Sequence, residues 1–176
     1  MSLKILLIGY GNPGRLDDGL GPAFAAMVDE LGLENVTVDA DYQLTVEDAA
    51  EVALYDAVVF ADASLVGEDA FEFKELVPCR EVNFSTHSVE PGEVLALAHE
   101  IFNAQTRGFV LGIRGYEFNE FGETLSKRAL SNLQEALAFF EKAVRDGRLE
   151  DWVAQCAEGD ITGPSVVFSI TRGDLN

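Results

Sequence analysis

Basic residues are scarce in this chain. It has 12 lysines and arginines against 31 aspartates and glutamates, which gives a formal net charge of -19 at pH 7. A surface of this sign repels the phosphates of nucleic acids and the headgroups of anionic lipids. The composition therefore argues against nucleic acid and membrane surfaces as partners, and it favours proteins, cations or neutral molecules.

Cysteine and long apolar runs are also scarce. The two cysteines, Cys79 and Cys156, form no C-x-x-C pair, and residues 1–4 lead into a strand-like run without the pattern of a signal peptide. No apolar run approaches the roughly 20 residues that span a bilayer. We therefore expect a cytoplasmic protein with reduced thiols and no membrane segment.

The sequence nevertheless has ample material for a hydrophobic core. Of its 176 residues, 48% are hydrophobic, which suits one compact domain of this length. We predict a single α/β domain over residues 1–147. Residues 148–176 are predicted to form an acidic, partly ordered C-terminal tail.

Strand-like and helix-like patterns alternate along the chain. Short apolar or alternating runs predict strands at residues 3–8, 36–39, 57–62, 71–76 and 109–113, the fourth of them at a sheet edge. Helical spacing predicts helices at residues 20–31 and 46–54, from Pro91 onward, and in a long final helix striped by Leu133, Leu137, Phe140 and Val144. The pattern predicts a doubly wound, mostly parallel twisted sheet of about five strands with helices on both faces, and ligand sites beyond the carboxyl ends of its strands.

The loop after the first strand reads GYGNPGRLDDGLG and contains G-x-G-x-x-G, the fingerprint of dinucleotide-binding folds. Asp39, 25 residues past Gly14, fits the acid that binds ribose in such folds. However, Pro13 removes an amide donor from the loop, and Asp17 and Asp18 would place negative charge beside the phosphates. Nucleotide binding is therefore the less favoured interpretation.

Three other side chains suggest a metal site. Asp18 follows the first strand, Asp62 ends the third, and His87 precedes the helix that starts at Pro91. In a doubly wound sheet these positions can meet at one crevice, where two carboxylates and an imidazole suit nickel, zinc or a similar ion. From spacing alone, Asp18 could instead cap a helix, and a lone loop histidine is commonly solvated. We expect His99 to be an exposed helical residue.

The opening loop, the strand that ends in VVFADAS and the segment FSTHSVEPGEVL together resemble the hydrogenase maturation endopeptidases. The match runs in order from about residue 3 to residue 140. The resemblance implies an enzyme that removes the C-terminal extension of a nickel-iron hydrogenase large-subunit precursor after nickel insertion. It also implies that Asp18, Asp62 and His87 are the catalytic, metal-contacting residues. Gly11, by its conformational freedom, and Asn12, by local hydrogen bonds to the backbone, are expected to shape the turn that aims Asp18.

The resemblance also implies a ligand and a partner. Nickel would arrive bound to the precursor, with zinc or cadmium as substitutes in vitro, and the protease would act as a monomer. Some members of the family have glutamate at the position of Asp18, and some have D-G-G-T where this chain has DADYQL at residues 39–44. The YQL variant looks more like the branch that serves soluble hydrogenases. A metal-delivery or sensing protein that cuts nothing remains the alternative function.

Overall fold

The computed structural model describes residues 2–79 and 89–157, and in the last helix it describes side chains only as far as Val153. Strands and helices alternate along this part of the chain. The elements are β1 (Ile5–Tyr10), the 3-10 helix η1 (Leu16–Gly19), α1 (Leu20–Leu31), β2 (Val36–Asp41), α2 (Asp48–Val52), β3 (Ala57–Ser64), β4 (Phe71–Leu76), α3 (Pro91–Phe102), β5 (Arg107–Arg114), α4 (Lys127–Asp146) and α5 (Leu149–Ala157).

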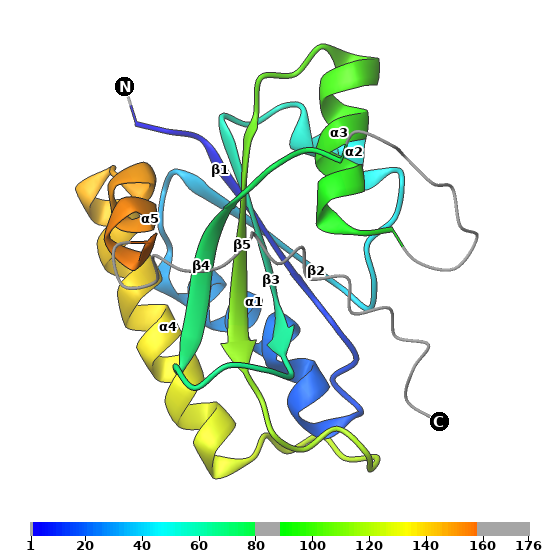
Figure 1. Ribbon diagram of the computed structural model, residues 1–176, viewed down its shortest axis with the longest axis vertical. Helices are drawn as coiled ribbons and strands as arrows, with labels where there is room; N and C mark the ends of the chain where they lie inside the picture. The colour runs from blue at the N-terminus through cyan, green and yellow to red at the C-terminus, as the bar shows by residue number, and fades with distance from the viewer. Residues whose placement is uncertain (1, 80–88, 158–176) are drawn as a thin grey trace.

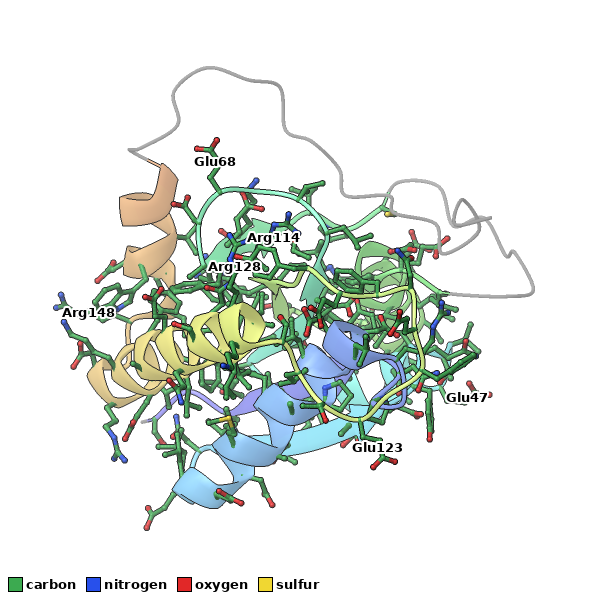
Figure 2. All side chains as sticks on the ribbon, turned by 90° about the horizontal axis from the view of Figure 1, so that it is seen from below. Glu47, Glu68, Arg114, Glu123, Arg128 and Arg148 are labelled. Atoms are coloured by element: carbon green, nitrogen blue, oxygen red, sulfur yellow. The ribbon has the colours of Figure 1, made fainter. Side chains whose placement is uncertain are left out.

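In the described residues, five strands form one sheet in the order β2-β1-β3-β5-β4. All neighbours pair in parallel except β4, which runs antiparallel to β5 at the edge. Helices α1, α4 and α5 cover one face of the sheet, and α2 and α3 cover the other (Figure 1). Seen from the carboxyl ends of the parallel strands, α1 and α4 lie next to each other (Figure 2). The predicted doubly wound, mostly parallel fold is confirmed.

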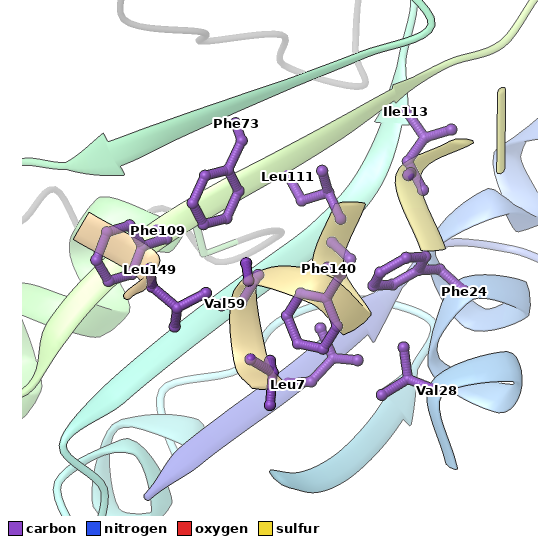
Figure 3. Close-up of a cluster of buried hydrophobic side chains, with 14 of the residues drawn as sticks. Leu7, Phe24, Val28, Val59, Phe73, Phe109, Leu111, Ile113, Phe140 and Leu149 are labelled. Carbon is purple, nitrogen blue, oxygen red and sulfur yellow. The ribbon is translucent and has the colours of Figure 1, made fainter. Parts of the chain in front are cut away.

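Two apolar clusters hold the sheet between its helices. On one face, Phe24 of α1 and Phe140 of α4 pack edge to face, with ring centroids 5.5 Å apart, over the sheet (Figure 3). The second cluster joins alternate residues of β1 and β3 to α2 and α3, and it includes Leu6, Ile8, Val58, Phe60, Val94 and Leu97. Successive strand side chains point to opposite faces, so β1 and β3 are buried on both sides. Their sequences are therefore nearly continuous apolar runs.

Several predicted element boundaries are wrong. Strand β1 lies two residues further along the chain than predicted, and β2 and β5 are longer than predicted. Strand β3 continues past Asp62 to Ser64, so Asp62 lies inside the last part of the strand instead of ending it. The helix expected at residues 46–54 is restricted to α2. Strand β3 extends to Ser64 because its pairing with β5 continues to the pair of Ser64 and Arg114.

The predicted final helix, α4, is followed by another. Helix α5 lies within residues 148–176, the segment predicted as a tail, and its Leu149 is buried in the larger core cluster. Trp152 packs edge-on against Phe139 of α4, with ring centroids 5.5 Å apart. The prediction for residues 158–176 lies outside the described residues. Among the helices that are described, none has the length and apolar character needed to cross a bilayer.

His99 of α3 is not the exposed residue that the sequence predicted. It is half-buried, and its ring Nε2 lies 2.7 Å from the carbonyl oxygen of Thr106, just before β5. The Thr106 hydroxyl shares its hydrogen between the carbonyl oxygens of Val52, the last residue of α2, and Tyr55, just beyond that helix. His99 therefore contributes to a polar junction between α3, α2 and β5, at the end of the sheet opposite the predicted site.

The first turn of α1 lies in direct backbone contact with two strands. A Cβ atom added to Gly21 would lie 2.2 Å from the carbonyl oxygen of Tyr10 and 2.6 Å from that of Ala61. A Cβ added to Gly9 would lie 2.2 Å from the carbonyl oxygen of Gly21. Glycine at both positions therefore lets α1 approach the carboxyl ends of β1 and β3 closely.

Asp17 ties the loop before α1 to a distant part of the chain. Its side chain is completely buried and accepts hydrogen bonds from the backbone amides of Tyr116, Glu117 and Ser126, at 2.8, 3.0 and 2.7 Å, and from the Ser126 hydroxyl at 2.7 Å. Burial alone would raise the pKa of the Asp17 carboxyl, but these hydrogen bonds outweigh it and hold the pKa below its ordinary value. The backbone amide of Asp17 also donates to the carbonyl of Glu117 at 2.9 Å.

Replacing Gly21 by alanine should destabilise the protein by about 2–3 kcal/mol, because the methyl group overlaps two backbone carbonyls that have little room to move. A loss of stability would be informative, because at an ordinary helix position alanine is about 1 kcal/mol more favourable than glycine. Urea denaturation at pH 7 measures the difference. The matched control is Gly112→Ala, whose Cβ would meet only the Cβ of Ser64 at 3.5 Å. Equal stability of the two variants would contradict the close packing of α1.

The Asp17→Asn variant should lose about 2–4 kcal/mol of unfolding free energy at pH 7. The NH₂ group of asparagine would face backbone N–H donors that need an acceptor. The pKa of Asp17 in the folded protein lies below its ordinary value of 3.8, so its stabilisation is complete above that value and is lost as pH falls from it through the lower folded pKa. The difference between wild type and variant should therefore shrink between pH 5 and pH 3. Urea denaturation across that range tests this, with the exposed Asp29→Asn as control. A constant difference would show that the charge of Asp17 is not responsible.

Candidate functional site

The turn after β1 has the geometry that the sequence predicted for Gly11 and Asn12. Gly11 has a φ of 143°, and a Cβ there would lie 2.1 Å from the carbonyl oxygen of Asp18. The side-chain oxygen of Asn12 accepts from the backbone amide of Gly14 at 2.9 Å, a local bond typical of asparagine in turns. The turn therefore folds residues 11–14 back toward η1.

Asp18 closes this turn from the other side. Its Oδ2 accepts from the backbone amide of Asn12 at 2.9 Å, and the side chain is half-buried. Asp18 does not cap α1, because the residue that precedes this helix is Gly19. The cap interpretation is therefore wrong for α1, but Asp18 does lie as an acid in the first turn of η1. Its carboxylate accepts a hydrogen bond from the loop.

Asp62 lies near the carboxyl end of β3, opposite Gly112 of β5. It follows Phe60 by two positions, so its side chain leaves the sheet on the face covered by α2 and α3. It is half-buried, and its Oδ1 accepts from the backbone amide of Ala63 at 2.8 Å. Asp62 is thus a carboxylate fixed on a central strand.

The two aspartates share one edge of the sheet. The chain passes from β1 outward to β2 on one side and then returns to β3 on the other, so the strand order reverses between β1 and β3. Asp62 belongs to β3, and Asp18 lies in the connection from β1 to α1, whose Gly21 touches both strands. Ligands of doubly wound folds bind at this switch point, beyond the carboxyl ends of the strands.

The third predicted ligand, His87, lies outside the described residues. The chain re-enters the described part at residue 89, and Glu90 and Glu93 form a reciprocal capping box at the start of α3. Within residues 2–79 and 89–157, no three histidine, cysteine, aspartate or glutamate side chains form a group that could hold a metal ion. A complete metal site therefore requires His87 and remains a prediction.

The neighbouring end of β2 is strongly acidic. Asp39 and Asp41 lie opposite Ile8 and Tyr10 of β1. Burial raises the pKa of the Asp48 carboxyl, hydrogen bonds from Thr45 offset part of that rise, and the charges of Asp39 and Asp41 add to it. This concentration of negative charge favours cations near the switch point and opposes a pyrophosphate group.

The structure gives little support to dinucleotide binding. Helix α1 begins only at Leu20, after η1, so its first amides are displaced from the glycine motif at residues 9–14. Asp17 and Asp18 occupy the intervening turn, and Asp18 accepts the backbone amide of Asn12 within the glycine motif. The loop serves to position carboxylates.

A hollow of about 310 Å³ lies beside the same loop. Its lining is mainly apolar. It comes from the segment between β1 and α1, from the first turn of α1 and from the segment before α4: Pro13, Leu16, Gly19, Pro22, Ala23, Glu123 and Leu125. Neither Asp18 nor Asp62 lines it. We therefore place the candidate site at the carboxyl edge of β1 and β3.

Residues 115–126, to which no sequence pattern pointed, hold the opening loop in place. Besides the bonds to Asp17, Gly122 exchanges backbone hydrogen bonds with the opening loop, from Leu16 at 2.8 Å and to Gly14 at 2.9 Å. No local pattern announces these contacts, because the bonds to Asp17 span 99 to 109 positions. Only the buried charge of Asp17 hints that such partners must exist.

No family model and no curated protein matches the chain. Among solved structures, the NiFe hydrogenase maturation protease HycI from Thermococcus kodakarensis matches with a TM-score of 0.65 at 21% identity, over 82% of this chain and 94% of that one. The hydrogenase maturating endopeptidase HybD from E. coli matches with a TM-score of 0.59 at 17% identity, over 82% and 93%. An uncharacterized protein from Wolinella succinogenes matches with a TM-score of 0.59 at 26% identity, over 80% and 95%.

The likeness covers about four fifths of this chain and nearly the full length of each solved chain. This chain has the fold of the NiFe hydrogenase maturation proteases.

Proposed function

We propose that this protein is an endopeptidase that removes the C-terminal extension from the large-subunit precursor of a nickel-iron hydrogenase after nickel has been inserted. The fold supports this function, since solved proteins of the same architecture are hydrogenase maturation proteases. A fold alone hosts many chemistries. The observation that carries the proposal is therefore the presence of two half-buried carboxylates, Asp18 and Asp62, at the switch point.

In this proposal the nickel ion of the precursor is part of the substrate, and Asp18, Asp62 and His87 contact it. Carboxylate oxygens and an imidazole nitrogen form a donor set that suits nickel or zinc. The backbone amides of Asn12 and Ala63 donate hydrogen bonds to the two carboxylates, and such donors orient the ligands of metal ions. Recognition of the metal would make cleavage wait for correct loading of the precursor.

Hydrolysis of the peptide bond requires a positioned water molecule and a group that takes its proton. A bound metal ion polarises the scissile carbonyl or lowers the pKa of a bound water. Asp18 and Asp62 supply carboxylate oxygens that orient the water and accept its proton, which then passes to the amine of the departing peptide. The acidic end of β2 favours the approach of the cationic metal centre.

The Asp62→Asn variant should fold normally and should fail to process a nickel-loaded precursor, because the amide keeps the shape of the side chain and removes an anionic ligand. Mass spectrometry of the precursor before and after incubation measures loss of the C-terminal peptide. The control is Asp29→Asn, at the far end of α1, which should process at the wild-type rate. Full processing by folded Asp62→Asn would remove Asp62 from the site. Metal binding by the wild type without any cleavage would favour the metal-delivery alternative.

The two histidines should separate function from stability. His87→Ala should abolish processing with little change in unfolding free energy. His99→Ala should process normally but lose about 1 kcal/mol of stability, because it removes the hydrogen bond to the Thr106 carbonyl. The same mass-spectrometric assay and urea denaturation give both readouts. The opposite ranking in the processing assay would show that His87 is the wrong ligand.

The isolated protein should bind one nickel, zinc or cadmium ion per chain at pH 7.5, measured by calorimetry. Binding should be lost in His87→Ala and retained in His99→Ala. It should also be much weaker at pH 5.5, because an imidazole has an ordinary pKa of about 6.5 and must be neutral to coordinate a metal. Equal affinity at the two pH values would leave the carboxylates as the only ligands.

A further inference from the structure

Two arginines at the carboxyl edge of the sheet have no acidic partner in the described part of the chain. The ion pairs found there use Lys74, Arg107, Arg145 and Arg148. Arg114, at the end of β5, and Arg128, in the first turn of α4, have no carboxylate within 4.0 Å among the described residues. Unpaired guanidinium groups are unexpected in a chain with a net charge of -19.

Both guanidinium groups lie over one aromatic ring. The Cζ atom of Arg114 is 4.7 Å from the ring centroid of Tyr116, and that of Arg128 is 3.9 Å from it. Figure 2 shows the two arginines together at this edge, and Glu68, which is labelled near them, forms no ion pair within the described residues. A ring attracts each cation through its face and uses none of the in-plane N–H groups. Among the described residues, these groups stay available on Arg128 and on Nη2 of Arg114, whose Nε and Nη1 donate to backbone carbonyls.

Hydrogen bonds hold Arg114 and Tyr116 in place. Arg114 donates from Nε to the carbonyl of Gly67 at 3.0 Å and from Nη1 to the carbonyls of Ser64, at 3.5 Å, and Gly115. The Tyr116 hydroxyl accepts from the side-chain amide of Asn132 at 3.0 Å. These partners are neutral, so they orient Arg114 and Tyr116 without neutralising the positive charge.

Arg128 lies where a cation does not stabilise its own helix. The first turn of α4 contains Lys127 and Arg128 and no acidic residue, although the positive end of the helix dipole favours acids there. Arg128 is exposed, unlike the half-buried Arg114. Its position is therefore better explained by an anionic ligand than by helix stability.

The two arginines are coupled to the candidate site by the sheet and by Asp17. Arg114 faces Ser64, two positions beyond the pair formed by Asp62 and Gly112 on the same two strands. The backbone amide of Tyr116 donates to Asp17, the residue next to Asp18. A peptide that reaches Asp62 along this edge would therefore pass the arginines.

We propose that Arg114 and Arg128, stacked on Tyr116, bind a carboxylate of the peptide substrate. The N–H groups of a guanidinium match the two oxygens of a carboxylate. Because the rest of the surface is negative, a carboxylate of the substrate is attracted to these two arginines and repelled elsewhere. The carboxylate is either the chain terminus of the substrate or the side chain of an aspartate or glutamate. This inference rests on the proposed peptidase function for its substrate class.

Direct binding of short peptides to the full-length protein tests the proposal without any cleavage. The probes are N-acetylated trialanine with a free carboxylate, the same peptide as a C-terminal amide, and an amide-capped peptide with one internal aspartate. Nuclear magnetic resonance titration follows the ring signals of Tyr116 and the Nε–H signals of the arginines. The variant is Arg128→Gln, which spares the backbone contacts of Arg114, and the control is Arg148→Gln in the segment between α4 and α5.

We expect a carboxylate peptide to shift these signals in the wild type and in Arg148→Gln, with affinity at least about tenfold weaker in Arg128→Gln. Binding of the free-carboxylate peptide alone would identify the chain terminus, and binding of the internal-aspartate peptide would identify a side chain. In a processing assay, Arg128→Gln should raise KM and leave kcat unchanged. Absence of binding by both carboxylate peptides, or equal affinity in Arg128→Gln, would overturn the proposal. Peptide binding by a protein that cleaves nothing would overturn the proposed function only.

Discussion

The hydrogen bonds that converge on Asp17 join two loops that are 99 to 109 positions apart in the sequence. One loop carries Asp18, and the other carries Tyr116 and leads into α4. A buried carboxylate is tolerated only when hydrogen bonds replace its lost hydration, and here three amides and a hydroxyl do so. The same bonds fix both loops, so the proposed substrate contacts of Asp18 and of the arginines stacked on Tyr116 depend on this one charge.

The second constraint is steric. Gly9 and Gly21 allow backbone atoms of α1 to lie against β1 and β3, where any side chain would overlap a carbonyl oxygen. This contact brings the loop before α1 over the point where the strand order reverses. Asp62 reaches the same edge from within β3. Two carboxylates therefore meet the switch point from independent elements, one placed by a loop and the other by a strand.

The charge distribution divides this edge into two regions. Asp39 and Asp41 make the end of β2 acidic, and their charges add to the rise in the pKa of Asp48 that its burial causes. On the other side of β3, Arg114 and Arg128 lie over Tyr116. A substrate with a metal centre at one point and a carboxylate at another would be oriented by both regions. This arrangement gives a physical reason why a chain with so few basic residues places two of them together.

Much of the fold could be predicted because its causes are local. The continuous apolar runs of β1 and β3 reflect burial on both faces, and the alternation in residues 71–76 reflects an edge position. The end of α1 at Gly32 was also predictable, since that glycine adopts the left-handed conformation that closes a helix. The extension of β3 to Ser64 and the docking of α5 were not, because pairing with β5 and packing on Phe139 decide them.

The sequence by itself determined the alternation of strands and helices, the turn formed by Gly11 and Asn12, and the candidates Asp18, Asp62 and His87, because each depends on residue type and short spacing. Tertiary structure decided which of two adjacent acids is buried in hydrogen bonds and which stays half-buried beside the turn. Asp17 and Asp18 are chemically identical neighbours, and only contacts with residues 116–126 bury the first. It also decided that Arg114 and Arg128 share one ring, since long-range packing brings together charges that no local pattern connects.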